Sequence, residues 1–137
     1  KRGELPRPGG IIIMAIGTAT LTEVAHTSVK KIKWVWASSA DNQGATKATT
    51  KAYDGLIERA EFIPDGGGTQ PTNAYDVTIT DSDSVDVLAG LGADLSNAAT
   101  VTKVHSNGLG AVAGSVLTLN VSNAGLSKGG TVLLYLR

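Results

Sequence analysis

Residues 28–38, SVKKIKWVWAS, carry the plainest structural signal in the chain. Apolar and polar side chains alternate along this stretch with a period of two, which is the pattern of a half-buried β-strand. One face carries Ile32, Trp34 and Trp36, and the other carries Lys31, Lys33 and Val35. The alternation predicts that both tryptophans belong to the core, whereas exposed tryptophans would instead form a binding platform.

Three later segments show the same period of two. Their predicted inward faces are Tyr75, Val77 and Ile79; then Leu117, Leu119 and Val121; and finally Val132, Leu134 and Leu136. Turns rich in Gly, Asn and Asp separate the segments, and helical periodicity is almost absent. Some seven or eight short strands predict an all-β fold, an antiparallel β-sandwich or jelly-roll-like single domain over residues 18–137. The last strand is expected to hold its end of the chain within a sheet.

Other segments give weaker signals. In residues 53–63 one face is expected to hold Leu56, Ala60 and Phe62, and because Glu58 interrupts that face, the strand is predicted to lie near a sheet edge. Residues 38–50, SSADNQGATKATT, are polar and predict a loop. Spaced leucines in residues 85–104 predict one or two helical turns through Leu88, Leu91 and Leu95.

Composition narrows the possible functions. The 137 residues fit one domain, and the absence of cysteine excludes disulfides, thiolate metal sites and cysteine nucleophiles. Twelve basic and twelve acidic residues cancel, whereas a nucleic-acid-binding domain is usually strongly basic. Because of this charge balance, we do not expect nucleic acid as a partner. We do not expect a membrane either, because the longest apolar run, near residue 11, is far shorter than the about 20 residues of a membrane span.

No group of residues forms a specific catalytic or metal-binding motif, so we expect a protein that is not an enzyme and has no cofactor. Asp81, Asp83 and Asp86 alternate as cation ligands sometimes do, although the spacing lacks the glycine and glutamate of an EF-hand loop. Aspartates that accept hydrogen bonds from nearby backbone amides in a turn are the favoured interpretation. His26 and His105 have no partner at a defined spacing, and DGGGTQ, residues 65–70, lacks the lysine of a phosphate-binding loop.

The first seventeen residues differ from the rest and predict an extended N-terminal arm. Prolines and glycines in KRGELPRPGG, residues 1–10, oppose regular structure. An apolar run, Ile11 to Met14, follows. We expect residues 1–13 to be either an extension ahead of the domain or the remainder of a processed leader. The alternative is that Ile11 to Ile16 form the first strand of the body.

Several motifs together resemble a group of small β-rich virion proteins of tailed bacteriophages. The resemblance runs from about Thr18 to Arg137, and its most distinctive parts are PDGGGTQPTNAYDVTITD, residues 64–81, and the closing GGTVLLYLR, residues 129–137. It implies a head decoration (cement) protein, made in the host cytoplasm, that binds the outer surface of the phage head. The implied partner is the major capsid protein, whose neighbouring subunits the protein would bridge as a homo-oligomer, a dimer or trimer.

The arm supplies the predicted interaction residues, on physical grounds alone. Burial of one large aliphatic side chain contributes about 1.5 to 3 kcal/mol, which helps to offset the entropy lost when an arm is ordered. The predicted strap to the capsid consists of Lys1, Arg2, Arg7, Ile11, Ile12, Ile13 and Met14. Two alternatives remain, a neck, tail or fibre component and a carbohydrate-binding β-sandwich module on the virion surface.

Overall fold

The computed structural model describes residues 15–137, which form antiparallel β-sheets and two short 3₁₀ turns. The predicted all-β, antiparallel class is therefore confirmed. The strands are β1 (Thr18–Val24), β2 (Lys30–Ala37), β3 (Ala45–Ala48), β4 (Tyr53–Pro64), β5 (Asp76–Thr80), β6 (Val101–Val104), β7 (Ala111–Ser115), β8 (Thr118–Ser122) and β9 (Gly129–Leu136). The 3₁₀ turns are η2 (Gly67–Thr69) and η3 (His105–Asn107).

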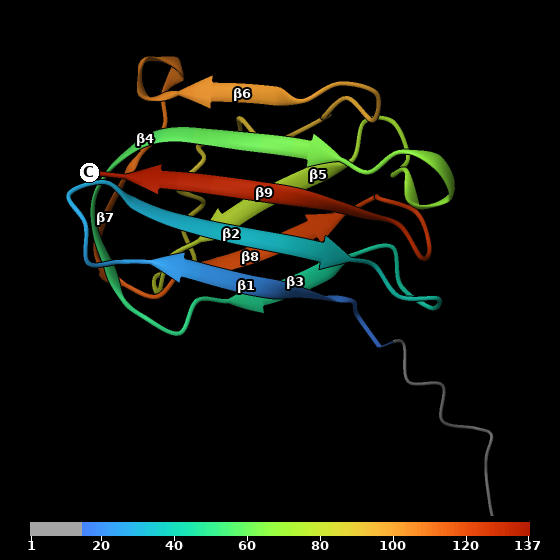
Figure 1. Cartoon of the computed structure of the whole chain (residues 1–137), viewed down its shortest axis with the longest axis horizontal. Coiled ribbons are helices and arrows are strands. Elements are labelled where there is room, and N and C mark those ends of the chain that lie inside the picture. Colours follow the sequence, from blue (N-terminus) through green and yellow to red (C-terminus); the bar gives the residue numbers. More distant parts are fainter. Residues whose placement is uncertain (1–14) are drawn as a thin grey trace, which may run out of the picture.

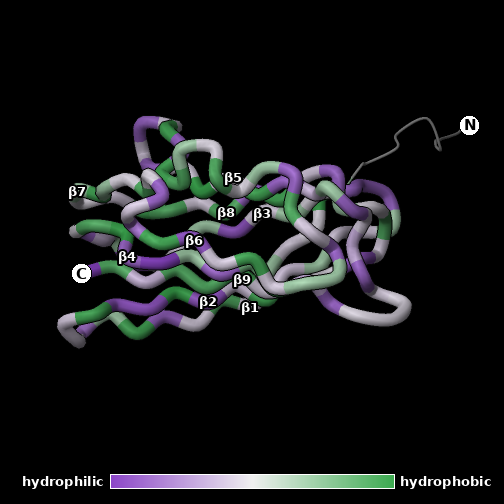
Figure 2. The backbone as a smooth tube through the Cα atoms, turned by 90° about the horizontal axis from the view of Figure 1, so that it is seen from above, coloured by the Kyte–Doolittle hydropathy of each residue, from purple (hydrophilic) through white to green (hydrophobic). Residues whose placement is uncertain are grey.

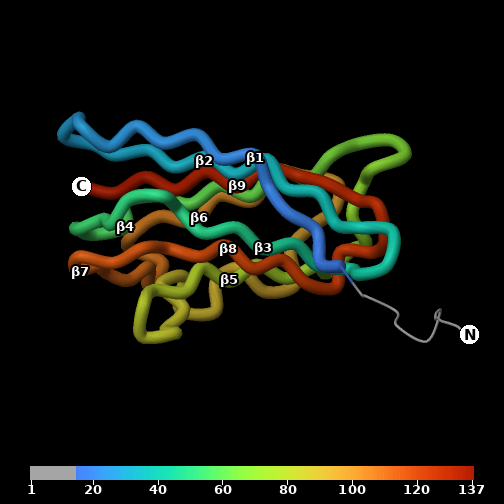
Figure 3. The backbone as a smooth tube through the Cα atoms, turned by 90° about the horizontal axis from the view of Figure 1, so that it is seen from below, coloured from blue at the N-terminus to red at the C-terminus, as the bar shows by residue number. Residues whose placement is uncertain are grey.

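The strands are arranged in two layers. The larger sheet has the order β1-β2-β9-β4-β6, with β7 paired to the first part of β4, and the smaller sheet has the order β3-β8-β5. In Figure 1 the smaller sheet lies behind the larger one, and Figures 2 and 3 show the same two layers from above and from below. The last strand, β9, lies between β2 and β4, so the expectation that it is held within a sheet is confirmed.

The layers curl toward each other beside β1. Gly17 forms a parallel bridge with Ala45 of β3, in which its N–H donates to the Gly44 carbonyl at 3.0 Å. The indole N–H of Trp34 donates to the carbonyl of Lys47 at 3.1 Å. One edge of the smaller sheet is therefore joined to the larger sheet by backbone and side-chain hydrogen bonds.

The core fills the space between the layers. All the residues of the four predicted inward faces are buried: Ile32, Trp34, Trp36, Tyr75, Val77, Ile79, Leu117, Leu119, Val121, Val132, Leu134 and Leu136. The prediction that both tryptophans belong to the core is thus confirmed. The rings of Trp36 and Tyr75 lie 5.8 Å apart and are tilted by 43°, an arrangement that aromatic pairs favour.

The prediction for the inward face of β4 was wrong at Leu56. Ile57, Ala60 and Phe62 are buried, whereas Leu56, placed on the buried face by strict alternation, is exposed. A shift in the β4–β9 register between Ile57 and Arg59 changes the phase of the strand. Such a bulge accommodates an extra residue without ending the strand. β4 has β9 on one side and β6 and β7 on the other, and because β6 ends the order of the larger sheet, β4 lies next to an edge strand, as predicted.

Two further expectations are corrected. Residues 38–50 are not all loop, because they contain β3, whose short ladder with β8 depends on a partner distant in sequence. Residues 88–95 form successive turns rather than helical turns, and Leu91 N–H, for example, donates to the Leu88 carbonyl at 3.0 Å. Positive φ angles at Ala89, Gly90 and Asp94 prevent a continuous right-handed helix. Within residues 15–137 no helix is long and apolar enough to cross a membrane.

Candidate interaction surfaces

The predicted strap lies outside the described residues. This applies to Lys1, Arg2, Arg7, Ile11, Ile12, Ile13 and Met14. The structure does show where the arm joins the body. Ala15 and Ile16 precede the first strand, and the hydroxyl of Ser39 donates to the Ala15 carbonyl. The arm therefore meets the body beside the start of β3, where the two layers are joined.

An open groove lies at this junction. It has a volume of about 550 Å³ and is lined by Ile16, Asp41, Asn42, Gln43, Gly44, Val121, Ser122, Asn123 and Leu126. Ile16 and Leu126 are each 48% exposed, although both are large aliphatic residues. The Asn42 side chain accepts a hydrogen bond from Gly44 N–H at 2.9 Å and so holds the loop that forms one wall. We call this the arm-junction groove.

A second depression lies on the outer face of the larger sheet, at the opposite end of the strands. It has a volume of about 280 Å³ and is lined by Val29, Glu58, Arg59, Val104 and Tyr135. We call it the outer-face pocket. Its position follows from the strand register, which places Arg59 of β4 opposite both Tyr135 of β9 and Val104 of β6.

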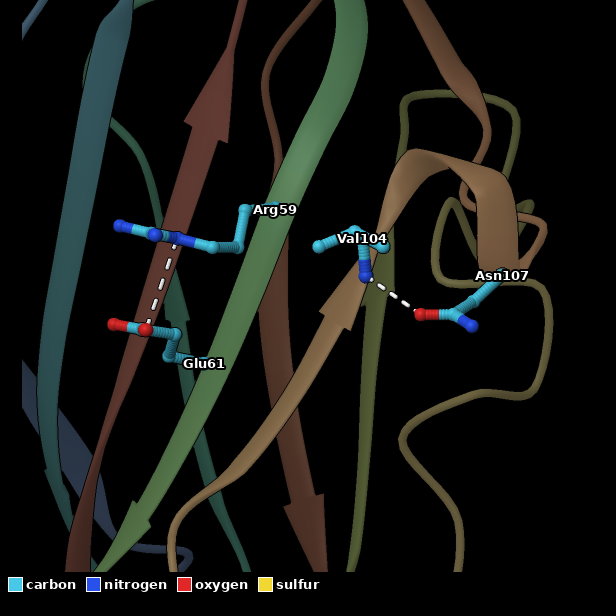
Figure 4. Close-up of polar contacts among 4 residues, drawn as sticks. All are labelled: Arg59, Glu61, Val104 and Asn107. Carbon is cyan, nitrogen blue, oxygen red and sulfur yellow. Dashed lines mark hydrogen bonds and ion pairs between the residues drawn. The ribbon is translucent and has the colours of Figure 1, made fainter.

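A cation–π contact, an ion pair and a hydrogen bond involve residues in and beside the outer-face pocket. The Arg59 guanidinium lies 4.6 Å from the centre of the Tyr135 ring, and its Nε is 3.7 Å from Glu61 Oε2. Figure 4 shows Arg59 reaching across β9 beside Glu61, and Val104 N–H donating to the Asn107 side chain at 2.8 Å. A guanidinium over an aromatic ring is an attractive cation–π contact, so Arg59 covers the ring face that a sugar would otherwise stack against.

Two of the three aspartates that were considered as cation ligands, Asp81 and Asp86, accept hydrogen bonds from backbone amides in turns. Asp81 Oδ1 accepts from Asp83 N–H at 2.9 Å and from Val85 N–H at 3.0 Å. Asp86 accepts from Ile79 and Leu88 at 3.1 Å and from Gly90 at 3.0 Å. The favoured interpretation of these aspartates as turn-forming residues is therefore confirmed for Asp81 and Asp86, whereas Asp83 contributes its backbone N–H to the turn. Among residues 15–137 no three His, Cys, Asp or Glu side chains are grouped so that they could hold a metal ion.

The histidines lie in different places and do not meet. His26 is exposed in the connection between β1 and β2, whereas His105 begins η3, where its Nδ1 lies 3.1 Å from the Ile57 carbonyl oxygen. Gly66, Gly67 and Gly68 have open space at the position of an added Cβ atom, so DGGGTQ forms an exposed turn. Within the described residues these segments have no common site.

One partly exposed polar cluster was not predicted. Glu23 at the end of β1 accepts from the hydroxyl groups of Thr50, at 2.5 Å, and Tyr53, at 2.7 Å. Partial burial alone would raise the pKa of the Glu23 carboxyl, but hydrogen bonds led by those from Thr50 and Tyr53 outweigh burial and lower the pKa below its ordinary value of 4.5. Burial raises the pKa of Tyr53, and the Glu23 carboxylate raises it further. The cluster fastens the edge strand β1 to the β3–β4 connection.

Tyr75 is the other residue with a strongly altered pKa. Burial, followed by the nearby charge of Asp65, raises the pKa of Tyr75 to about 12. Its packing against Trp36 explains the burial, so the shift belongs to the core and not to a site open to solvent.

In comparison with known proteins, the sequence matches no family model, and neither curated proteins nor solved structures give a match. Sequence reasoning did not find the arm-junction groove or the outer-face pocket. Both are assembled from segments far apart in the chain, such as Ile16 with Val121 and Val29 with Val104. The exposed aliphatic residues Ile16 and Leu126 were visible in the sequence, but only the fold brings them together.

Proposed function

We propose that this chain is a virion structural protein of a tailed bacteriophage, a decoration (cement) protein on the outer surface of the head. Its body would be a β-sandwich related to the jelly roll, formed by the two layers, and it would bridge neighbouring major capsid subunits. The protein would be made in the host cytoplasm and act as a homo-oligomer without enzymatic activity. The motifs in residues 64–81 and 129–137, which resemble small phage virion proteins, support this proposal.

The observation that carries the proposal furthest is the position of the arm-junction groove. The arm joins the body at Ala15, and the groove with its exposed Ile16 and Leu126 lies at the same place. Exposed aliphatic side chains that line a depression are typical of surfaces that contact another protein. An arm and a groove at one end would provide two adjacent contacts with a capsid, and linked contacts strengthen each other through effective concentration.

The carbohydrate-binding alternative has less support from the body. Five of the six aromatic residues are buried: Trp34, Trp36, Tyr53, Phe62 and Tyr75. The sixth, Tyr135, is covered on one face by Arg59. A flat sugar-binding face of the kind expected from exposed tryptophans is therefore not formed by these side chains.

The decisive experiment measures how many copies of this chain accompany the major capsid protein in purified particles. A decoration protein is expected in hundreds of copies spread over the head, whereas a neck or tail component forms a single ring on the particle axis. Quantitative gel densitometry gives the ratio, and antibody labelling in electron micrographs gives the location. If the ratio corresponds to a single ring of copies and the antibody label lies on the particle axis, the neck or tail alternative is correct.

A variant that lacks residues 1–13 tests the arm directly. We expect it to keep the thermal stability of the full chain while binding less tightly to preassembled, undecorated shells. If the truncated chain binds and protects shells as well as the full chain does, the strap is not the basis of attachment. If truncation unfolds the body, Ile11 to Ile16 belong to the body itself, as the alternative interpretation holds.

A further inference from the structure

The turn after β5 presents an exposed valine on a well-ordered support. Val85 is 57% exposed, the largest fraction among the large hydrophobic residues of the described range. Asp81 holds the turn from both sides, since its N–H donates to the Val85 carbonyl at 3.0 Å and its carboxylate accepts from Val85 N–H at 3.0 Å. Ser82 N–H donates to the Ser115 hydroxyl at 2.9 Å, which ties the turn to β7. We call residues 81–85 the β5 turn.

The outer-face pocket has a lining that suits such a turn. Val29, Val104 and Tyr135 provide apolar walls, and Val104 is itself 40% exposed. Arg59 provides a cationic group at the wall, and because its Nε also lies 3.7 Å from Glu61 Oε2, an entering carboxylate would share Arg59 with Glu61. The one carboxylate in the lining, Glu58, lies 3.6 Å from Arg137 Nε and is therefore partly neutralised. The β5 turn carries an aliphatic side chain, Val85, near a carboxylate, Asp83. This pair matches the apolar walls and the cationic Arg59 of the pocket.

Charge is distributed unevenly between the two layers. The sequence from residue 62 to residue 102 contains six aspartates and no lysine or arginine. This acidic stretch includes β5 of the smaller sheet and the β5 turn. The outer face of the larger sheet carries Lys31 and Lys33 of β2 with Arg59 and Glu61 of β4, so basic side chains outnumber acidic ones among these four. The acidic turn and the basic face are thus complementary in charge, which favours their association.

A chain cannot place this turn in its own pocket. The β5 turn follows a strand of the smaller sheet and is tied to β7, whereas the pocket opens on the outer face of the larger sheet. Figure 3 shows the segment after β5 on the side of the molecule away from β2 and β9. The occupant must come from another molecule, and a second copy of this chain carries a matching turn.

We propose that copies of this protein associate by insertion of the β5 turn of one copy into the outer-face pocket of another. Val85 lies against Val29, Val104 and Tyr135, while Asp83 faces Arg59. The contact joins two different surfaces, so it links copies head to tail and forms a ring if the rotation closes. It needs no capsid, and its test is therefore separate from that of the decoration function.

Sedimentation equilibrium of the full chain over a range of concentrations tests the contact. We expect the mean mass to rise with concentration, and Val85→Asp to weaken the association by about tenfold or more, which corresponds to about 1.4 kcal/mol. Leu126→Asp is the matched control, because Leu126 is also an exposed aliphatic residue but lines the arm-junction groove. A mass that stays monomeric throughout, or equal effects of the two substitutions, would overturn the proposal.

A mixing experiment identifies the two surfaces. Asp83→Arg gives the turn a positive charge, and Arg59→Asp gives the pocket a negative one, so each variant alone should associate less than the unmodified chain. An equimolar mixture should associate again, because the turn of the first variant complements the pocket of the second. Thermal melts confirm that both variants are folded before mixing. A mixture that associates no better than its separate components contradicts the pairing of Asp83 with Arg59.

Discussion

Trp34 on β2 donates its indole N–H to the carbonyl oxygen of Lys47 on β3, at 3.1 Å, and so joins the two sheets with a side-chain hydrogen bond. Trp36, two residues further along the same buried face, has an indole N–H that is buried without a hydrogen-bond partner in the described part of the chain. Two equally buried tryptophans therefore contribute differently to the fold. The difference can be measured.

Trp34→Phe should be more destabilising than Trp36→Phe. Both substitutions remove a similar volume, but only the first takes the indole donor away from the partly buried Lys47 carbonyl, and loss of a partner for a buried polar group costs up to about 1 to 3 kcal/mol. Trp34→Ala should cost about 3 to 5 kcal/mol, as expected for a large core residue. Urea unfolding of the three variants gives these differences. Equal losses for the two Phe variants would show that the Trp34–Lys47 bond contributes nothing measurable.

Gly130→Ala should destabilise the protein by about 1 to 3 kcal/mol, the usual cost of overpacking a core. An added Cβ would lie 2.9 Å from Cζ2 of Trp36 and 2.9 Å from the Ile63 carbonyl oxygen. Gly66→Ala is the matched control, because open space surrounds that position and its φ of −102° suits alanine. Thermal melts should show a clear loss for the first variant and almost none for the second.

Glu23→Gln should reduce the free energy of unfolding at neutral pH by about 1 kcal/mol. Hydrogen bonds to a buried charge contribute more than this, but solvent weakens them at a partly exposed site. The pKa of Glu23 is lowered by folding, so its contribution is complete above the ordinary pKa of 4.5 and is lost as the pH falls through the lower folded value. Melting temperatures of the two proteins should therefore converge below pH 4.5. A difference that stays constant into acid would show that the charge is not involved.

The same cluster predicts a loss of stability in alkali. Folding raises the pKa of Tyr53, so the neutral phenol contributes stability that is complete below its ordinary pKa of 10.0 and is lost as the pH rises above that value. Tyr53→Phe keeps the ring but removes the ionisable group. Its melting temperature should fall less steeply than that of the unmodified chain above pH 10.0, and an identical decline would contradict the prediction.

Asp86→Ala should cost about 1 to 3 kcal/mol, because three backbone N–H groups lose their acceptor. Asp83→Asn should be close to neutral for folding, since surface substitutions are usually within about 0.5 kcal/mol. Addition of Ca²⁺ should not raise the melting temperature of the unmodified protein. A calcium-dependent increase that disappears in Asp86→Ala would revive the cation-binding interpretation of the three aspartates.

Salt should separate the two parts of the predicted arm. Exposed contacts of Lys1, Arg2 and Arg7 should weaken as the screening length falls from about 10 Å at 0.1 M to about 3 Å at 1 M ionic strength. Apolar contacts of Ile11 to Ile13 should persist. In shell-binding assays, neutral replacements of the basic residues should therefore matter mainly at low salt, and Ile→Ser replacements at every salt. Identical salt profiles for the two sets would contradict this division.

The sequence predicted the fold best where a simple period of two continued to the end of a strand. The inward faces of β2, β5, β8 and β9 follow that rule residue by residue. β4 breaks it at Glu58, and alternation alone cannot show whether a polar residue marks an edge or a bulge. The bulge depends on the register with β9, about 75 residues further along, which no local pattern contains.

The candidate interaction surfaces were predicted less well than the fold, for a similar reason. Val85 and Leu126 were recognisable as apolar residues, but their exposure depends on which strands flank them. The roles of Asp81 and Asp86 could be inferred, because a turn-forming aspartate bonds to amides only a few residues away. Hydrogen bonds between residues within about five positions of each other could be predicted. Surface exposure and pockets, which depend on the packing of segments far apart in the sequence, could not.

The central position of β9 has a consequence for how the protein is made. β2 and β4 do not pair with each other, and residues 129–136 fill the place between them. During synthesis, both flanking strands leave the ribosome long before the strand that joins them, so the larger sheet cannot close while translation of the domain continues. Until then its unpaired strand edges are open to wrong partners, and a chaperone bound during synthesis would protect them.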